Sequence, residues 1–195
     1  MMAEKPKKQL ILEAAFEVFA QKGFHSTKVD EIAERAGIGK GTIYEYFKSK
    51  ADVFHEMYIW YVDKYFAELE EGLLDESEPT LKLKRIVKNH IIFLNNVKNL
   101  AGKLLNESST HMDMGAEFKK TMVNSYKEKM DRIKVIIEEG IQKGVFREID
   151  VTLCTMFFFG ILGGISHAMF LLDMDINPDD VAEKVIDILL NGIKK

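Results

Sequence analysis

Hydrophobic residues recur along most of this chain at intervals of three and four, the spacing that places them on one face of an α-helix. Glycines and prolines interrupt the pattern, leaving short segments near the N-terminus and longer ones after them. The pattern therefore predicts an all-α protein of about nine helices. The expected helices lie at about residues 6–22, 28–36, 40–47, 50–73, 80–94, 97–111, 116–143, 151–172 and from 178 onward.

The most informative stretch follows Ala36, where one short helix stops and another begins. Gly37 is placed to end the first helix as a C′ glycine. Ile43 and Phe47, four residues apart, give the second helix a buried side. A helix, a tight glycine turn and a second short helix form a helix-turn-helix, and its recognition helix is expected at residues 40–47.

Two predicted caps frame this unit. We expect Thr27 to be the N-cap of the helix before the turn, with Asp30 in the position of a capping box. Ser49 is expected to cap the long helix that follows, with Asp52 at its third position. Lys50 would lie in the first turn of that helix, where a cation opposes the helix dipole. A DNA phosphate is the partner that would favour a lysine there.

The outward face of the recognition helix is small and polar. Gly41, Thr42 and Tyr44 point away from the buried pair, with Lys40 and Tyr46 at the flanks. Small residues let a helix backbone approach base edges, and threonine and tyrosine can donate to phosphates or bases. The glycine lowers helix propensity by about 1 kcal/mol relative to alanine, which is reasonable if close approach matters there.

Residues 9–55 resemble the DNA-binding domain of the tetracycline-repressor (TetR) family. The resemblance rests on many positions that match in order rather than on one motif. The matching residues are Ile11, Ala14, Ala15, Phe19, Gly23, Phe24, Thr27, Ile32, Ala33, Ala36, Gly37, Gly41, Thr42, Ile43, Tyr44, Tyr46, Phe47, Lys50, Val53 and Phe54.

The resemblance implies an all-helical, homodimeric, one-component transcriptional repressor that binds a double-stranded operator. It implies that Thr42 and Tyr44 meet the DNA and that Lys50 and Thr27 contact phosphates. Gly39 departs from the family, which often has a serine or threonine cap there, and Tyr46 stands where histidine is common. The candidate DNA-binding residues are Thr27, Lys28, Lys40, Gly41, Thr42, Tyr44, Tyr46 and Lys50.

The rest of the chain is expected to bind a ligand and to dimerise, giving a DNA-binding domain at residues 1–50 and a second domain at 51–195. The long helix after Ser49 would link the two mechanically. Its tyrosines share a face and would either line a cavity or fill the core. The body is also rich in methionine, which suits flexible apolar ligands and ordinary cores alike. The candidate ligand-binding residues are Tyr58, Tyr61, Tyr65, Phe93, Met122, Tyr126 and Phe158.

The resemblance favours a ligand cavity over a plain core, and the effector is expected to be a hydrophobic or amphipathic small molecule. A long-chain acyl compound, a drug-like cation and an aromatic compound remain open. His90 lies on the apolar side of its helix and is expected to be a satisfied core histidine.

Residues 151–172 contain no Asp, Glu, Lys or Arg and are long enough to span a bilayer. Polar residues, three glycines and acidic flanks favour instead a helix buried on nearly all sides in a protein that does not use a membrane. With the last helix it would form the dimer interface that the resemblance implies. The candidate interface residues are Phe157, Gly160, Gly164, Ala168, Val181, Val185 and Ile188.

Charge and cysteine content suggest which part of the chain approaches DNA and where in the cell the protein is found. The net charge is −4, divided into +2 over residues 1–50 and −6 over the remainder. This suggests that only the head approaches DNA, although ordinary charge scatter explains it equally well. The single cysteine and a start without an apolar h-region predict a cytoplasmic protein.

Two other classes of protein are alternatives to a regulator. A membrane-anchored interaction protein would use residues 151–172. A small enzyme would need a nucleophile–base set, a metal cluster or a phosphate loop. The five histidines are scattered, and the Gly39-Lys40-Gly41-Thr42 run fails the phosphate-loop pattern because position 34 is Glu34. We therefore expect no enzymatic activity, no cofactor and no metal site.

Overall fold

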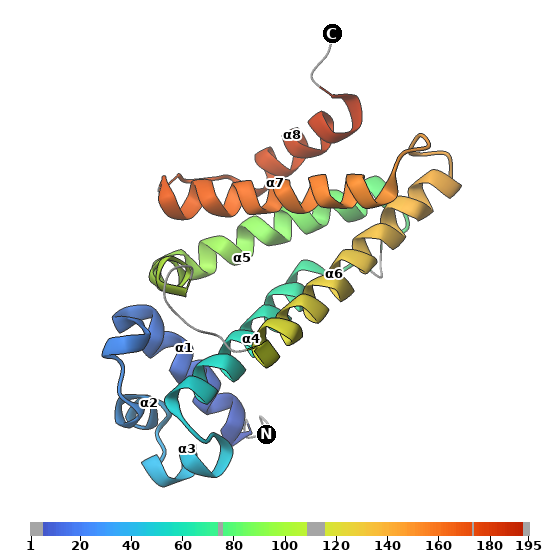
Figure 1. Cartoon of the computed structure of the whole chain (residues 1–195). Coiled ribbons are helices and arrows are strands. Elements are labelled where there is room, and N and C mark those ends of the chain that lie inside the picture. Colours follow the sequence, from blue (N-terminus) through green and yellow to red (C-terminus); the bar gives the residue numbers. More distant parts are fainter. Residues whose placement is uncertain (1–5, 74–75, 109–115, 173, 193–195) are drawn as a thin grey trace, which may run out of the picture. The chain divides into compact units, whose positions relative to one another are not determined.

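The computed structural model describes residues 6–73, 76–108, 116–172 and 174–192, with the backbone alone at 97–108, 116–119, 122 and 125. Over these residues the chain is all-helical, without strands (Figure 1). Its helices are α1 (Lys7–Ser26), α2 (Val29–Ala36), α3 (Lys40–Tyr46), α4 (Lys50–Leu69), α5 (Pro79–Ser108), α6 (Ala116–Gln142), α7 (Val151–Leu171) and α8 (Pro178–Asn191).

The described residues form eight helices where about nine were expected. The two helices predicted at 80–94 and 97–111 are the single helix α5. Only Asn95 and Asn96 separate the two predicted segments. An asparagine lowers helix propensity by a fraction of a kcal/mol, whereas starting a new helix needs a new nucleus, so the helix continues.

The chain divides into two compact units, residues 1–64 with 99–119 and residues 65–98 with 120–195. The first fifteen residues of α4 thus belong to the same unit as α1, α2 and α3, the predicted DNA-binding head. This division concerns packing, and the functional boundary expected after residue 50 stays a prediction.

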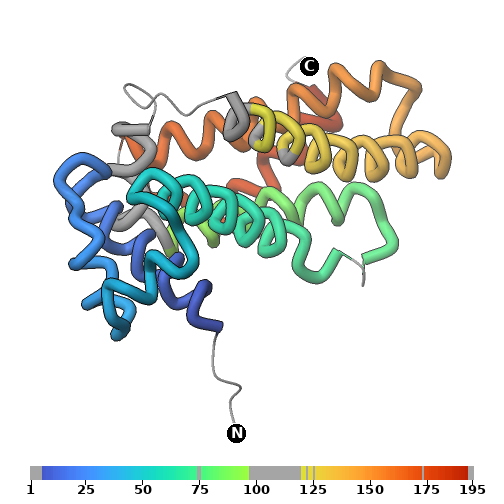
Figure 2. Tube along the Cα trace, turned by 60° about the horizontal axis from the view of Figure 1, so that its bottom comes forward, coloured from blue at the N-terminus to red at the C-terminus, as the bar shows by residue number. Residues whose placement is uncertain are grey.

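In the first unit, α1, α2 and α3 lie together in both views (Figures 1 and 2). Gly23 interrupts α1 with φ 78°, as expected of the glycine placed to stop that helix. Behind the break, the ring of Phe24 lies 5.7 Å from Phe19 and 5.3 Å from Phe54, centroid to centroid. This aromatic group fixes the start of α4 against α1.

In the second unit, α5 touches each of the other three long helices. Lys82 of α5 pairs with Glu139 of α6 at 2.7 Å, and Lys88 of α5 pairs with Asp179 of α8 at 2.6 Å. On α7 the backbone of Leu162 accepts a hydrogen bond from α5, as described below. Between the helices the core is aliphatic and aromatic. Its most buried members are Leu83, Ile86, Val87, Ile91, Ile137, Phe158, Met169 and Ala182.

Candidate functional site

The predicted turn between α2 and α3 is present. Gly37 has φ 68°, and its N–H donates to the carbonyl of Glu34 at 3.1 Å. The N–H of Ile38 donates to the carbonyl of Ala33 at 3.0 Å, which completes a Schellman end to α2. Gly39 is the N-cap of α3 and makes no side-chain cap, as its sequence predicted.

The predicted sides of α3 are also confirmed. Ile43 and Phe47 are buried, whereas Tyr44 is 49% exposed and Tyr46 is 45% exposed. Gly41 is exposed too, and a Cβ added there would meet none of the described atoms within 4 Å. Packing against the described residues therefore does not require glycine at this position. A residue without a side chain would instead allow a partner outside the chain to approach the helix closely.

The cap predicted for α2 is wrong by one residue. The N-cap is Lys28, whose N–H donates to the carboxylate of Glu31 at 3.0 Å, so neither Thr27 nor Asp30 makes the expected cap. Thr27 is 2% exposed, and its hydroxyl donates to the carbonyl of Gly23 at 2.7 Å. That bond uses the only hydroxyl proton of Thr27. The phosphate contact predicted for Thr27 stays a prediction, and the hydroxyl would have to break this bond to donate to a phosphate.

The other candidate cations of the head lie at the surface. Lys28 and Lys40 are exposed, and Lys40 pairs with Asp30 at 2.9 Å. The Asp30 carboxylate raises the pKa of Lys40 by hydrogen bonding. Because exposed ion pairs add little stability, a phosphate can replace the aspartate at small cost.

Lys50 has an internal role that its sequence position did not indicate. Its ammonium donates to the carbonyls of Phe24 at 2.7 Å, Thr27 at 2.8 Å and His25 at 3.2 Å. The three bonds satisfy backbone carbonyls at the end of α1, and this explains a lysine in the first turn of α4 without any DNA. A phosphate contact by Lys50 stays a prediction, and the ammonium would have to leave a carbonyl to make it.

The cap of α4 is confirmed. The N–H of Asp52 donates to Ser49 Oγ at 3.1 Å, and the Asp52 carboxylate accepts from the N–H of Lys48 at 2.8 Å. The helix that begins beside the recognition helix therefore has a firmly defined start.

A buried polar network joins three helices of the second unit. His90 of α5 is 2% exposed, and its Nε2 lies 2.8 Å from the carbonyl oxygen of Leu162. A carbonyl can only accept, so Nε2 carries the proton and Nδ1 accepts from the hydroxyl of Tyr65 at 2.6 Å. Ser166 Oγ is 3.2 Å from Nε2 and donates to the same carbonyl.

Burial lowers the pKa of His90 to about 4, because the charged imidazolium loses its solvation. His90 is thus the satisfied core histidine that its place on the apolar side predicted. Its partners were not predicted, since Tyr65 and Ser166 come from other helices and no local spacing connects them.

The seven candidate ligand-binding residues are divided between the two units. Tyr58 and Tyr61 belong to the first unit, where Tyr61 stacks on Phe16 with ring centroids 4.2 Å apart. In the second unit Tyr126 is 48% exposed, while Phe93 and Phe158 are buried in the core. The side chain of Met122 lies outside the described residues. These seven assignments stay predictions.

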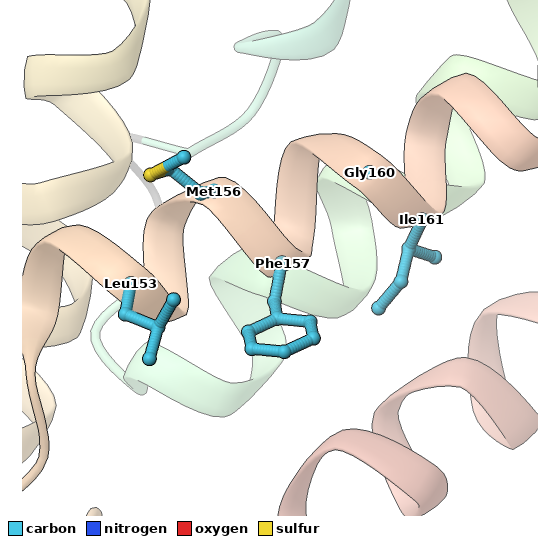
Figure 3. A pocket seen from close by; sticks show the side chains of 5 residues that line it. All are labelled: Leu153, Met156, Phe157, Gly160 and Ile161. Carbon is cyan, nitrogen blue, oxygen red and sulfur yellow. The ribbon is translucent and has the colours of Figure 1, made fainter.

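The burial predicted for residues 151–172 is wrong for the single chain. The helix α7 is long and apolar enough to cross a membrane, and 28% of its most apolar 18-residue window is buried. Figure 3 shows Leu153, Phe157 and Ile161 projecting from one side of α7 beside a surface hollow, and Phe157 is 64% exposed. Apolar content alone did not reveal how much of the helix the chain covers.

Most candidate interface residues lie on uncovered surface. Gly160 and Gly164 are exposed, and within the part of the chain that the structure describes a Cβ added at either would meet no atom within 4 Å. Ile188 of α8 is exposed as well, whereas Ala168, Val181 and Val185 are half-buried. A large uncovered apolar face with small residues in it suits close approach by another helix.

Two families match the chain. Residues 11–57 match the bacterial regulatory proteins of the tetR family, and residues 76–195 match the C-terminal region of QacR-like proteins. The fatty acid metabolism regulator protein of Bacillus subtilis (strain 168) is 27% identical over 194 residues, which cover 99% of this chain and 98% of that protein.

Solved structures agree with this match. One is the transcriptional regulator FadR of Bacillus subtilis in complex with stearoyl-CoA, with a TM-score of 0.80 and 27% identity over 95% of this chain and 99% of that one. Another is the fatty acid degradation regulator FadR of Bacillus halodurans, with a TM-score of 0.80 and 26% identity over 96% of each chain.

Regulators of this family bind operator DNA and small-molecule ligands as dimers. The family match shows a regulator and not an enzyme, and it favours the regulator over the membrane-anchored interaction protein. This chain belongs to the TetR family and is a ligand-responsive, DNA-binding transcriptional regulator.

Proposed function

We propose that this protein is a cytoplasmic repressor that leaves a palindromic operator when a long-chain fatty acyl compound binds its second unit. The effector class is supported by the regulators of fatty acid metabolism and degradation that are similar to this chain along nearly its whole length. The structure of one of them contains stearoyl-CoA. Among the effectors left open by the sequence, this favours the acyl compound over a drug-like cation or an aromatic compound.

The exposed face of α3 reads the operator in this proposal. Gly41 allows the backbone to approach base edges, Thr42 and Tyr44 contact bases, and Lys40 and Tyr46 flank them. Lys28 lies at the start of α2 and contacts phosphate. A dimer formed through α7 and α8 sets the spacing of two recognition helices on one side of the duplex.

One observation carries the regulatory part of the proposal. The helix α4 runs without a break from Lys50 to Leu69. Near its first end Lys50 binds the carbonyls that join α1 to α2, and near its other end Tyr65 binds His90. An acyl ligand with higher affinity for a state in which the Tyr65 end has moved would therefore displace the Lys50 end as well.

Operator selection tests this function. The full-length protein is used to select duplexes from random DNA, and the selected duplex is then titrated with myristoyl-CoA and with myristate, with coenzyme A alone as the control. We expect enrichment of a palindrome and its release by an acyl compound but not by coenzyme A. Enrichment of no palindrome would overturn the DNA-binding proposal, whereas a palindrome that myristoyl-CoA and myristate leave bound would overturn the effector.

A further inference from the structure

A lysine is buried inside the second unit. Lys129 of α6 is 8% exposed, although Lys127 and Glu128 beside it are exposed. Its ammonium lies 5.3 Å from the centroid of the Phe66 ring, in the range of a cation–π contact. Lysines are almost never so deeply buried unless a specific interaction holds the charge there.

The Phe66 ring beside this ammonium is part of a chain of aromatic contacts that joins three helices. Phe66 comes from the last turns of α4, Phe159 from α7, and Tyr126 lies one turn before Lys129 on α6. The centroid of the Phe159 ring is 5.2 Å from Tyr126 and 6.5 Å from Phe66. We call these four residues, Lys129, Phe66, Tyr126 and Phe159, the Lys129 cluster.

The Lys129 cluster reaches the surface on one side. Tyr126 is 48% exposed, and Phe66 and Phe159 are half-buried. A ligand can therefore meet the rings from solvent before it meets the ammonium.

The chemistry of the cluster suits an anion attached to a hydrocarbon chain. A ring face attracts a cation through its quadrupole but offers no lone pair to the ammonium protons, whereas an anion would accept charge-assisted hydrogen bonds from them. The aromatic surroundings lower the local dielectric and strengthen such a bond. The same rings give methylene groups an apolar surface.

We infer that the Lys129 cluster binds the negatively charged headgroup of the acyl effector, with Lys129 as its counter-charge. This inference rests on the proposed function and adds the place where the head of the ligand is held. Lys129 also interacts elsewhere in the chain, and the headgroup competes with that interaction when it arrives. Because Phe66 belongs to α4, the headgroup contacts the helix that leads to the DNA-binding head.

Calorimetric titration of the full-length protein tests the inference with three ligands that share a fourteen-carbon chain: myristate, myristoyl-CoA and the uncharged 1-tetradecanol. We expect the wild-type protein to bind myristate or myristoyl-CoA at least about tenfold more tightly than the alcohol. The Lys129→Met variant should lose about tenfold for the anions and bind the alcohol unchanged. The exposed neighbour supplies the matched control, Lys127→Met, which should behave as wild type.

The two anions distinguish the source of the charge. Dependence on Lys129 for myristate shows that the site binds a carboxylate at the end of the acyl chain. Dependence for myristoyl-CoA alone assigns the bound charge to the phosphates, because the thioester is uncharged. Lys129→Arg keeps the charge and should keep the preference for anions, so this variant and the wild-type comparison stand even if Lys129→Met does not fold.

Equal binding of anion and alcohol by the wild-type protein would overturn the inference, as would full anion binding by Lys129→Met. In either case release of the operator by myristoyl-CoA would leave the proposed function standing. If neither anion releases the operator from the wild-type protein, the proposed effector fails and the inference fails with it.

Discussion

Two helices of this protein present faces that the chain itself does not fill, and their chemistry is opposite. The free face of α3 is small and polar around Gly41, whereas that of α7 is large and apolar around Gly164. At both glycines an added Cβ would meet no atom of the described residues within 4 Å. Packing against the described residues therefore explains neither glycine. In the function proposed above the two faces meet different external partners, DNA for α3 and a second copy of the chain for α7.

Filling the free face of α7 should have the largest effect. Gly164→Leu places a bulky side chain where the second copy would approach, so the protein should become monomeric in light scattering. Because operator affinity needs both half-sites, it should fall at least about 100-fold. Gly164→Ala, which keeps the residue small, is the graded control. A fully dimeric Gly164→Leu would show that α7 meets something other than its own copy.

The buried side of α7 differs from its free face, because other helices of the same chain contact it. His90 binds the Leu162 carbonyl, and burial lowers its pKa from 6.5 to about 4. The unfolded chain therefore takes up this proton at a higher pH than the folded chain does. The contribution of His90 to the free energy of unfolding therefore keeps its full value above pH 6.5 and decreases as the pH falls from 6.5 towards 4.

At pH 5 the free energy of unfolding should be about 2 kcal/mol lower than at pH 7.5 through His90. Urea unfolding at the two pH values measures it, with His90→Gln as the variant that lacks the titrating group. If the variant shows the same pH dependence as wild type, His90 is not held neutral by its surroundings.

Removing one of the two exposed tyrosines of α3 tests the polar face. Tyr44→Ala should weaken operator binding about tenfold, the usual effect of losing one base or phosphate contact. It should leave thermal stability unchanged, because the side chain is 49% exposed. Fluorescence anisotropy measures the affinity. Ile43→Ala is the counterpart on the buried side of the same helix and should destabilise the fold instead; equal operator affinity for Tyr44→Ala and wild type would remove the ring from the interface.

Gly41→Ala should have the smallest effect. It should raise the stability of the fold and lower the affinity for the operator. The helix propensity of alanine is more favourable than that of glycine by up to about 1 kcal/mol, and none of the described residues obstructs its Cβ. The same methyl group would hold the backbone away from the bases, so operator affinity should fall several-fold. A variant that gains stability and keeps its affinity would separate Gly41 from close approach to DNA.

The sequence predicted what depends on residues a few positions apart. The Gly37 turn, the buried Ile43 and Phe47 and the Ser49 cap are local patterns, and the structure has all of them. Gly39 also left α3 without a side-chain cap, as its residue type implied.

The sequence did not predict contacts between distant segments. Lys50 binds the carbonyl of Phe24, 26 residues away, and His90 binds Leu162, 72 residues away. The periodicity of α7 marked it as apolar but could not show how little of it the chain covers. Such contacts depend on how helices pack. The spacing of hydrophobic residues within one helix does not show which other helices pack against it.

The most direct test of the account is the coupling between operator and effector in one preparation. Operator affinity is measured by fluorescence anisotropy with and without saturating myristoyl-CoA, and myristoyl-CoA affinity is measured with and without the operator. We predict that each ligand weakens the other at least about tenfold and by the same factor, as linkage requires. Equal operator affinity in the presence and absence of myristoyl-CoA would contradict the account.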